Sequence, residues 1–316
     1  MQVNFLHYPN LTLDREPTPA VIAIGMFDGV HEGHRRVIDA ARRMGADLDL
    51  PVEAFTFVEH PRTVLRPDSP VPLLTPWPEK LTRLRALGLD ACIAAHFTPD
   101  LAALAPEEFV DRLLVHQLGV AGVVTGFNFH FGRGQAGNTT ILRELGQAHG
   151  FPVEVVQAIE QDGGVVSSSR LRELIATGRI EEANQLLGYA YSLTGTVVHG
   201  DKRGRTIGFP TANMDVPREK LLPAYGVYAC WVQLGDQRLA GVVNIGQRPT
   251  FDPPKLMVEA HVFDWNGDIY GQEITVSLVQ RIRAEQAFSG IDALIAQITA
   301  DCLVARKALA QAASAT

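Results

Sequence analysis

Hydrophobic residues in the first half of the chain come in short runs that have the length of β-strands. Between these runs lie stretches such as 34–45, in which apolar residues recur at the spacing of an amphipathic helix. This alternation predicts βαβ units and a parallel sheet. The strand-like runs are AVIAIG (20–25), VEAFTF (52–57), DACIAAHF (90–97) and VAGVVTG (120–126).

The second half of the chain changes to a period of two residues, with turn sequences such as LGDQ and WNGD between its segments. This pattern predicts an antiparallel, closed β-barrel. A C-terminal helix is expected after Ser289, because the apolar residues that follow share one helical face. The strand-like segments are 192–200, 226–235, 237–246, 256–264 and 272–283.

A length of 316 residues favours two domains. A helix is expected over residues 170–188, between the two halves. We therefore predict one domain over residues 1–187 and a second over residues 188–316.

Composition and charge narrow the classes of protein. Hydrophobic residues make up 46% and charged residues 20%, which is an ordinary globular balance. A net charge of −7 argues against a nucleic-acid partner, because such binders usually carry a basic stripe. The three cysteines, Cys92, Cys230 and Cys302, match no metal spacing and no disulfide framework. No segment has the pattern of a membrane span or a secretory signal, so we expect a soluble, cytoplasmic protein.

The sequence GMFDGVHEGH (25–34) places two histidines where a strand is expected to end and a helix to begin. Backbone N–H groups point at an anion in such a strand–turn–helix arrangement. His31 and His34 are three residues apart and share a helical face, so both can donate hydrogen bonds to a phosphate. Asp28 and Gly29 are expected to shape the turn. Two surface histidines near a helix start are the alternative interpretation.

Two further motifs of the first half fit a nucleotide site. In VVSSSRLRELIATG (165–178), Ser168 and Ser169 offer hydroxyl and N–H groups at a helix start, and Arg172 can clamp a triphosphate. An ordinary serine cap is the alternative. In TGFNFHFGRGQAG (125–137), Asn128 and Phe129 lie in an aromatic, glycine-rich loop that suits a flat ligand and its phosphate. A strand with one aromatic face explains this motif equally well.

The second half contains a separate set of candidates. HGDKRGR (199–205) is a glycine-rich basic loop that can fold over ATP phosphates through Gly200, Lys202 and Arg205. In GFPTAN (208–213), Thr211 and Asn213 supply hard oxygen ligands that suit Mg²⁺. A polar turn is the alternative.

Glu259 lies inside a strand-like run, and kinases need a carboxylate that accepts the proton of the attacking hydroxyl. A surface glutamate on an edge strand is the competing interpretation.

The order of these motifs resembles the bacterial bifunctional riboflavin kinase/FAD synthetase family over roughly residues 15 to 310. The resemblance implies a Rossmann-like nucleotidyltransferase domain followed by a riboflavin kinase barrel. It implies Thr211 and Asn213 at Mg–ATP and Glu259 as the base for the ribityl 5′-hydroxyl. It also places Arg283 and Phe288, in RIRAEQAF, near the flavin.

One residue departs from the family pattern. The family usually has Phe-x-Pro-His-Pro where this chain has Phe57-Val58-Glu59-His60-Pro61. The substitution adds a carboxylate and leaves His60 in place, so we interpret Glu59 as a tuning change.

We therefore expect two consecutive reactions, with riboflavin, ATP, FMN and FAD as substrates and products and Mg²⁺ as the metal. Two alternatives remain at this stage. His-x-Gly-His transferases also act on other acceptors, such as phosphopantetheine and nicotinamide mononucleotide. A flavin-binding regulatory protein would keep both folds without turnover, although intact histidines and an intact Glu259 argue against it.

Overall fold

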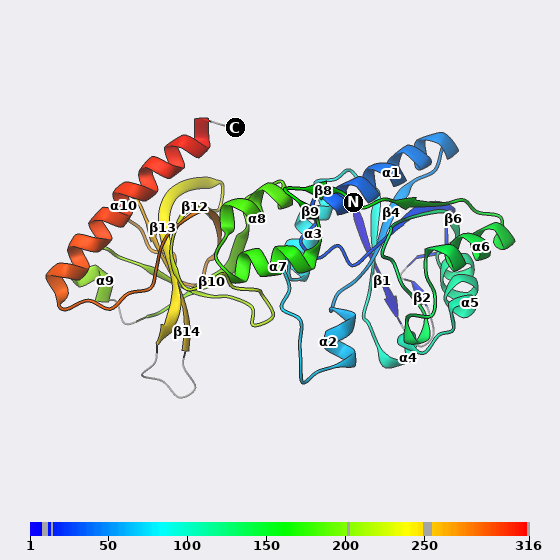
Figure 1. Ribbon diagram of the computed structural model, residues 1–316, viewed down its shortest axis with the longest axis horizontal. Coiled ribbons are helices and arrows are strands. Elements are labelled where there is room, and N and C mark those ends of the chain that lie inside the picture. Colours follow the sequence, from blue (N-terminus) through cyan, green and yellow to red (C-terminus); the bar gives the residue numbers. More distant parts are fainter. Residues whose placement is uncertain (8–11, 14, 201–202, 249–254, 315–316) are drawn as a thin grey trace. The chain divides into compact units, whose positions relative to one another are not determined.

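The computed structural model describes residues 1–7, 12–13, 15–200, 203–248 and 255–314. The chain forms two compact units, Met1–Ser168 and Ser169–Thr316 (Figure 1). The units are described separately below.

The first unit is built on a seven-stranded sheet with the order β2-β1-β5-β4-β3-β6-β7. All neighbouring pairs are parallel except β1 and β2, so the predicted parallel sheet is confirmed. The edge strands β2 and β7, and β1 next to β2, were not predicted. The strands are β1 (Gln2–His7), β2 (Thr12–Leu13), β3 (Ala20–Ile24), β4 (Val52–Phe57), β5 (Ala91–Ala95), β6 (Val120–Gly126) and β7 (Val153–Val156).

Helices cover both faces of this sheet. Alternate residues of β3 point to opposite sides, and each set packs in a different core. Val21 and Ala23 pack in one core with Ile38 of α1, and Ile22 packs in a second core with Leu113. A short hairpin, β8 (Glu160–Gln161) and β9 (Gly164–Val165), follows the sheet. The helices are α1 (Glu32–Leu48), α2 (Pro61–Leu65), α3 (Trp77–Arg85), α4 (Pro99–Ala102), α5 (Pro106–Glu108), the π-helix Phe109–Gln117, the 3₁₀ turn Arg133–Gln135 and α6 (Thr139–His149).

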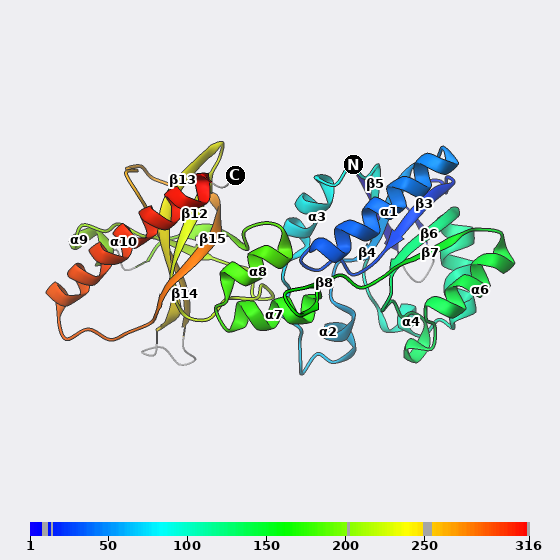
Figure 2. The same ribbon diagram turned by 45° about the horizontal axis from the view of Figure 1, so that its top comes forward.

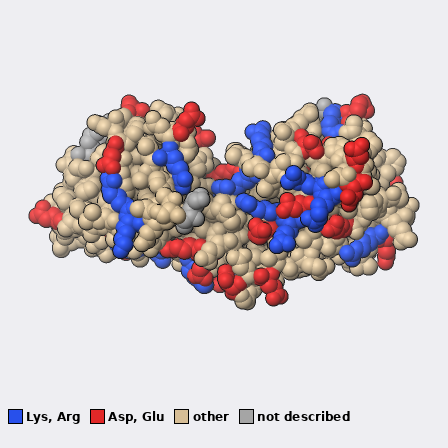
Figure 3. Space-filling view, turned by 90° about the horizontal axis from the view of Figure 1, so that it is seen from above, with Lys and Arg blue, Asp and Glu red and all other residues tan. Residues whose placement is uncertain are grey.

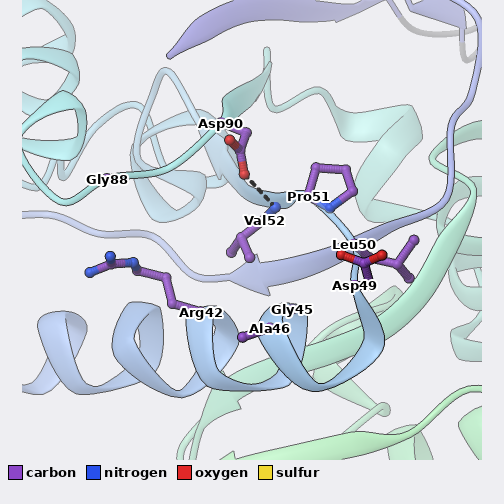
Figure 4. A pocket seen from close by; sticks show the side chains of 9 residues that line it. All are labelled: Arg42, Gly45, Ala46, Asp49, Leu50, Pro51, Val52, Gly88 and Asp90. Atoms are coloured by element: carbon purple, nitrogen blue, oxygen red, sulfur yellow. Dashed lines mark hydrogen bonds between the residues drawn. The ribbon is translucent and has the colours of Figure 1, made fainter.

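A polar depression of about 400 Å³ lies where β4 begins (Figure 4). The Asp90 carboxylate accepts a hydrogen bond from Val52 N there. Gly45 of α1 packs so closely that an added Cβ would lie 2.4 Å from Val52 Cγ2. Ligands of open α/β sheets bind at the opposite, carboxyl edge. The depression therefore reflects tight helix–strand packing and contains none of the predicted site residues.

The second unit contains a closed antiparallel barrel with the strand order β10-β11-β14-β13-β12-β15, which confirms the predicted barrel. The short strand β11, which includes Asn213 of the GFPTAN motif, was not among the predicted strands. The strands are β10 (Ser192–Val198), β11 (Ala212–Asp215), β12 (Gly226–Leu234), β13 (Gln237–Arg248), β14 (Lys255–Val262) and β15 (Glu273–Ala284), with the short helix α9 (Arg203–Thr206) after β10.

The single helix expected over 170–188 is wrong, because two helices are present: α7 (Ser168–Ala176) and α8 (Ile180–Leu187). Gly178 ends α7 with a left-handed φ of 77°, a conformation that favours glycine. Its N–H donates to Ile175 O, and Arg179 N donates to Leu174 O. These bonds satisfy the carbonyl groups at the end of α7 and redirect the chain.

The helix α10 (Ile291–Ser314) packs on the outside of the barrel, against β12 and β13 (Figure 2). Val227 and Val242 from the strands meet Ala305 and Leu309 from the helix in one buried cluster. Tyr228 and Val243 alternate with these valines and are fully buried. Both faces of this part of the barrel wall are therefore covered.

Charged side chains of both signs are interspersed on the face of the first unit in Figure 3. Arg36 and Glu32 of α1 form an exposed ion pair, and Arg43 pairs with Glu154. Within the described residues, no helix has the length and apolar content needed to cross a membrane.

Candidate active sites

The turn that joins β3 to α1 is strained and rigidly packed. Phe27 and Val30 have left-handed φ angles of 49° and 36°, and their side chains are buried. Positive φ is rare for a β-branched residue and marks a conformation that the surroundings impose. The neighbouring Gly29, with a φ of 88°, adopts such a conformation without a Cβ penalty.

Asp28 holds this turn in place. Its carboxylate accepts hydrogen bonds from the backbone N–H groups of Leu74 and Thr75, at 3.1 and 3.0 Å. Thr75 Oγ1 accepts a bond from Gly29 N, and Ser168 Oγ donates to the carbonyl of Asp28. The side chain of Asp28 is buried and faces this loop. It therefore shapes the turn, and these contacts bring Ser168 to it.

The two predicted histidines lie together at the start of α1. Their rings stack with centroids 3.6 Å apart and planes 17° apart. His31 is the N-cap residue of α1, and its carbonyl accepts hydrogen bonds from the N–H groups of His34 and Arg35. Gly33 makes the stack possible, because an added Cβ would lie 3.1 Å from His31 Cε1. The His31 ring therefore occupies the space beside Gly33 that a larger side chain would need.

Burial lowers the pKa of His34 well below its usual value, and the positive charges of His31 and Lys80 lower it further. His34 is consequently neutral near pH 7. Its Nδ1 is buried and has no hydrogen-bond partner among the described residues. A buried N–H without a partner is more costly than a bare acceptor, so the proton belongs on Nε2. This tautomer leaves Nε2–H as the donor of the ring.

Lys80 of α3 is a buried cation at this edge of the sheet, which the sequence did not reveal. It is fully buried, and its Nζ donates to Phe57 O at the end of β4, at 2.8 Å. Burial lowers the pKa of Lys80 to about 8, against the opposing effect of Asp28. The sequence around Lys80 gives no sign that this lysine is buried. Its partner, Phe57, lies 23 residues earlier in the chain.

The aromatic loop after β6 places Asn128 next to the strand end and Phe129 on the core. Asn128 is exposed, with its Oδ1 3.5 Å from the Cβ position of Gly126. Phe129 stacks on Phe131 with centroids 5.5 Å apart, and Phe131 is buried. A backbone bridge from Phe131 to Gly137 closes the loop.

Glu59, which stands where the family usually has proline, links the ends of β4 and β5. Its Oε1 lies 2.7 Å from His96 Nδ1, and its Oε2 accepts a bond from Phe97 N. His60 keeps a structural role, because its Nδ1 accepts a bond from Arg62 N and caps α2.

Ser169 and Arg172 belong to α7 in the second unit. Their approach to the histidines stays a prediction.

A second site lies in the barrel unit, in a cavity of about 300 Å³. Glu259 is on β14 between β11 and β13, so it is not on an edge strand. The residues that line the cavity come from the barrel wall, the 204–209 segment, the loop after β15 and α10. They are Gly204, Ile207, Phe209, Thr211, Asn213, Val227, Val242, Asn244, Glu259, His261, Arg283, Glu285, Gln286, Phe288, Leu294, Ile298 and Asp301.

The candidate metal ligands, Thr211 and Asn213, and the candidate base, Glu259, all line this cavity. Asn213 is directly opposite Glu259 in the β11–β14 pair. Gly200 leaves room for the Asn213 amide, because an added Cβ would lie 2.3 Å from Nδ2. The Cβ position of Gly204 lies 3.4 Å from Thr211 Oγ1. Lys202 lies outside the described residues, as does the side chain of Arg205.

Arg283 is fixed by an ion pair with Asp301 of α10. Its Nε lies 2.9 Å from Asp301 Oδ2, and its Nη2 makes a second contact of 2.9 Å. Gln297 Nε2 also donates to Asp301, and the guanidinium lies 5.6 Å from the centroid of the Phe288 ring. The two predicted flavin residues therefore form one wall of the cavity. Asp301 was missed, because it contacts a strand 18 residues away in the sequence.

Among the described residues, no group of three His, Cys, Asp or Glu side chains is placed to hold a metal. The candidate ligands Thr211 and Asn213 offer two hard oxygen atoms. Such a set fits Mg²⁺ that takes its other ligands from water and nucleotide phosphates.

Each half of the chain matches a known protein family. A family model described as FAD synthetase matches residues 13–170, and one described as riboflavin kinase matches residues 187–309. Bifunctional riboflavin kinase/FMN adenylyltransferase from Listeria monocytogenes is 39% identical over 303 residues, covering 95% of this chain and 96% of that protein. The chain belongs to this bifunctional family. The bifunctional protein of Escherichia coli K12 is also 39% identical, over 91% of this chain and 92% of its own.

The fold of this riboflavin kinase/FMN adenylyltransferase family is also seen in a solved structure. A crystal structure named as a macrolide-efflux protein from Streptococcus pneumoniae matches with a TM-score of 0.85 and 32% identity. The match covers 92% of this chain and 95% of that one. The expected family, with its α/β and barrel units, is thereby confirmed.

Proposed function

We propose that this chain makes FAD in two consecutive steps, the phosphorylation of riboflavin to FMN and the adenylation of FMN. The proposal rests on one observation: each half of the chain brings together a separate set of candidate catalytic residues. The stacked pair of His31 and His34 follows β3 of the sheet, and Glu259 faces Asn213 in the barrel cavity. We assign adenylation to residues 1–187 and phosphorylation to residues 188–316.

In the kinase step, Glu259 accepts the proton of the ribityl 5′-hydroxyl. The hydroxyl oxygen forms a bond to the γ-phosphorus of ATP, and ADP leaves with the electrons of the broken P–O bond. Thr211 and Asn213 hold Mg²⁺, which when bound neutralises charge on the phosphates. Gly200, Lys202 and Arg205 cover the ATP phosphates. The flavin ring lies against the wall that Arg283 and Phe288 form.

In the adenylation step, a phosphate oxygen of FMN forms a bond to the α-phosphorus of ATP, and pyrophosphate leaves. The phosphate is already an anion, so this step needs alignment and charge stabilisation rather than a strong base. His31 and His34 donate hydrogen bonds to the phosphates. Ser168, Ser169 and Arg172 bind the triphosphate, and Asn128 and Phe129 bind phosphate or ribose and the flavin, respectively.

Separation of flavins by chromatography tests the proposal. Purified protein is incubated with riboflavin, ATP and Mg²⁺, and samples are taken over time. We expect FMN to appear first and then to be replaced by FAD. Accumulation of FMN alone would contradict adenylation, and the first unit would then be tested with other phosphorylated acceptors. Absence of any new flavin would favour a binding protein that has lost turnover.

Gly33→Ala is expected to lower FMN adenylation about tenfold, because small displacements of positioned groups are costly to rate. The new Cβ would lie 3.1 Å from His31 Cε1, so the ring would have to shift by a few tenths of an ångström within the stack. Protein stability should not fall, since alanine favours a helix over glycine by up to about 1 kcal/mol. Steady-state rates and thermal melting measure both effects.

Gly290→Ala is the matched control for Gly33→Ala, because an added Cβ there meets no atom within 4 Å. It should adenylate FMN at the wild-type rate. An unchanged rate in Gly33→Ala as well would show that the stacked geometry is not needed.

A further inference from the structure

One row of side chains crosses the cavity of the barrel unit from the proposed metal ligand to the proposed flavin wall. Strand register defines it: Asn213 is opposite Glu259, which is opposite Asn244. Asn244 is opposite Val227, and Val227 is opposite Arg283. Directly opposed residues of antiparallel strands point to the same face, and all five line the cavity.

Asn244 is the polar member of this row that has no role in the mechanism above. It is half-buried on β13, and the adjacent Val243 and Ile245 are fully buried on the other face of the strand. Val242, the preceding residue on the same face, packs in the apolar cluster beneath α10. An amide therefore interrupts an apolar face of β13 where that face lines the cavity.

The order of groups along the row matches the order of groups in riboflavin. The isoalloxazine ring is assigned to Arg283 and Phe288, and the 5′-hydroxyl is assigned to Glu259. Asn244 lies between these positions, about 5 Å from Glu259 as set by the spacing of neighbouring strands. The hydroxyl-bearing ribityl chain joins the same two ends of the substrate.

We propose that Asn244 binds the ribityl hydroxyls and selects a polyol chain in the kinase reaction. This inference rests on the proposed kinase function of the same cavity. The amide has a carbonyl acceptor and two N–H donors, so it can pair with hydroxyls in either sense. Bound substrate would exclude water from the half-buried amide, so the loss of a hydroxyl would leave that amide without a partner and would penalise substrates that lack it.

The test compares riboflavin with its 2′-, 3′- and 4′-deoxy analogues as substrates. In wild type, kcat/KM should fall for at least one analogue. Asn244→Leu replaces the amide by an apolar group of similar size. It should lower kcat/KM for riboflavin about ten- to a hundredfold. The ratio of kcat/KM for riboflavin to that for the selected analogue should approach one.

Two controls separate substrate selection from a structural effect. Gln233→Leu removes an exposed amide of β12 that bonds Gly235 O outside the cavity, and it should keep wild-type discrimination. Inhibition by lumiflavin, which has the ring system but no ribityl chain, should be unchanged in Asn244→Leu. Thermal melting checks folding. Asn244→Ala, which adds no bulk, replaces the leucine variant if that variant melts early.

A variant at position 244 that keeps wild-type discrimination would overturn the inference, even if its overall rate is lower. So would a wild type that uses all three deoxy analogues as well as riboflavin. A wild type that makes no FMN at all would overturn the proposed kinase function itself.

Discussion

Glu259→Gln is expected to lower riboflavin phosphorylation by about a hundred- to ten-thousandfold, the usual contribution of a general base. Glutamine keeps the size of the side chain but cannot accept the proton of the 5′-hydroxyl. Glu259 lies on β14, on the face that lines the cavity and directly opposite Asn213, and glutamine preserves its size, so the loss should fall on kcat rather than on folding. FMN formation from riboflavin and ATP measures it.

Asn213→Ala, opposite Glu259 on the adjacent strand, should change the dependence of FMN formation on Mg²⁺ concentration. Removal of a proposed Mg²⁺ ligand should lower FMN formation at low Mg²⁺, and higher Mg²⁺ should restore part of it. Added Mg²⁺ should not rescue Glu259→Gln. Both variants should convert supplied FMN to FAD at the wild-type rate. Equal loss of both activities would contradict separate sites, and full activity of Glu259→Gln would remove Glu259 as the base.

Local patterns were sufficient to predict the elements that carry the main site residues. The apolar run at 20–25, its terminal glycine and the following amphipathic stretch predicted β3, the turn and α1. Alternation along 256–264 predicted the strand that carries Glu259, and the structure shows Val258 and Ala260 on its interior face. The error at 170–188 was also local, because Gly178 inside a helical pattern is a possible C-cap signal.

The missed residues depend on contacts between distant segments. The partners of Asp28 are 46 and 47 residues away, and nothing in the sequence near 74–75 indicates them. The row through Asn244 exists only after β11, β14, β13, β12 and β15 adopt one particular register. Register depends on the closed barrel as a whole, so a single strand sequence does not determine which residues share a cavity.

His34→Ala is expected to lower FMN adenylation about a hundred- to a thousandfold, the usual cost of removing one donor to developing charge. The ring is neutral because burial and the charges of His31 and Lys80 lower its pKa, and its free donor is Nε2–H. Riboflavin phosphorylation, carried out by the other unit, should be unchanged. Adenylation at the wild-type rate would exclude His34 from the phosphate site.

The lowered pKa of His34 also makes the stability of the first unit depend on pH. Below its ordinary value of 6.5, the unfolded chain binds a proton at His34 that the folded chain does not. The free energy of unfolding therefore falls as the pH falls through this range. Melting temperatures at pH 7.5 and 5.5 should differ less in His34→Ala than in wild type, since the variant lacks this group. An equal difference in both proteins would mean that His34 titrates normally, and a protonated pair would then have to bind the phosphates.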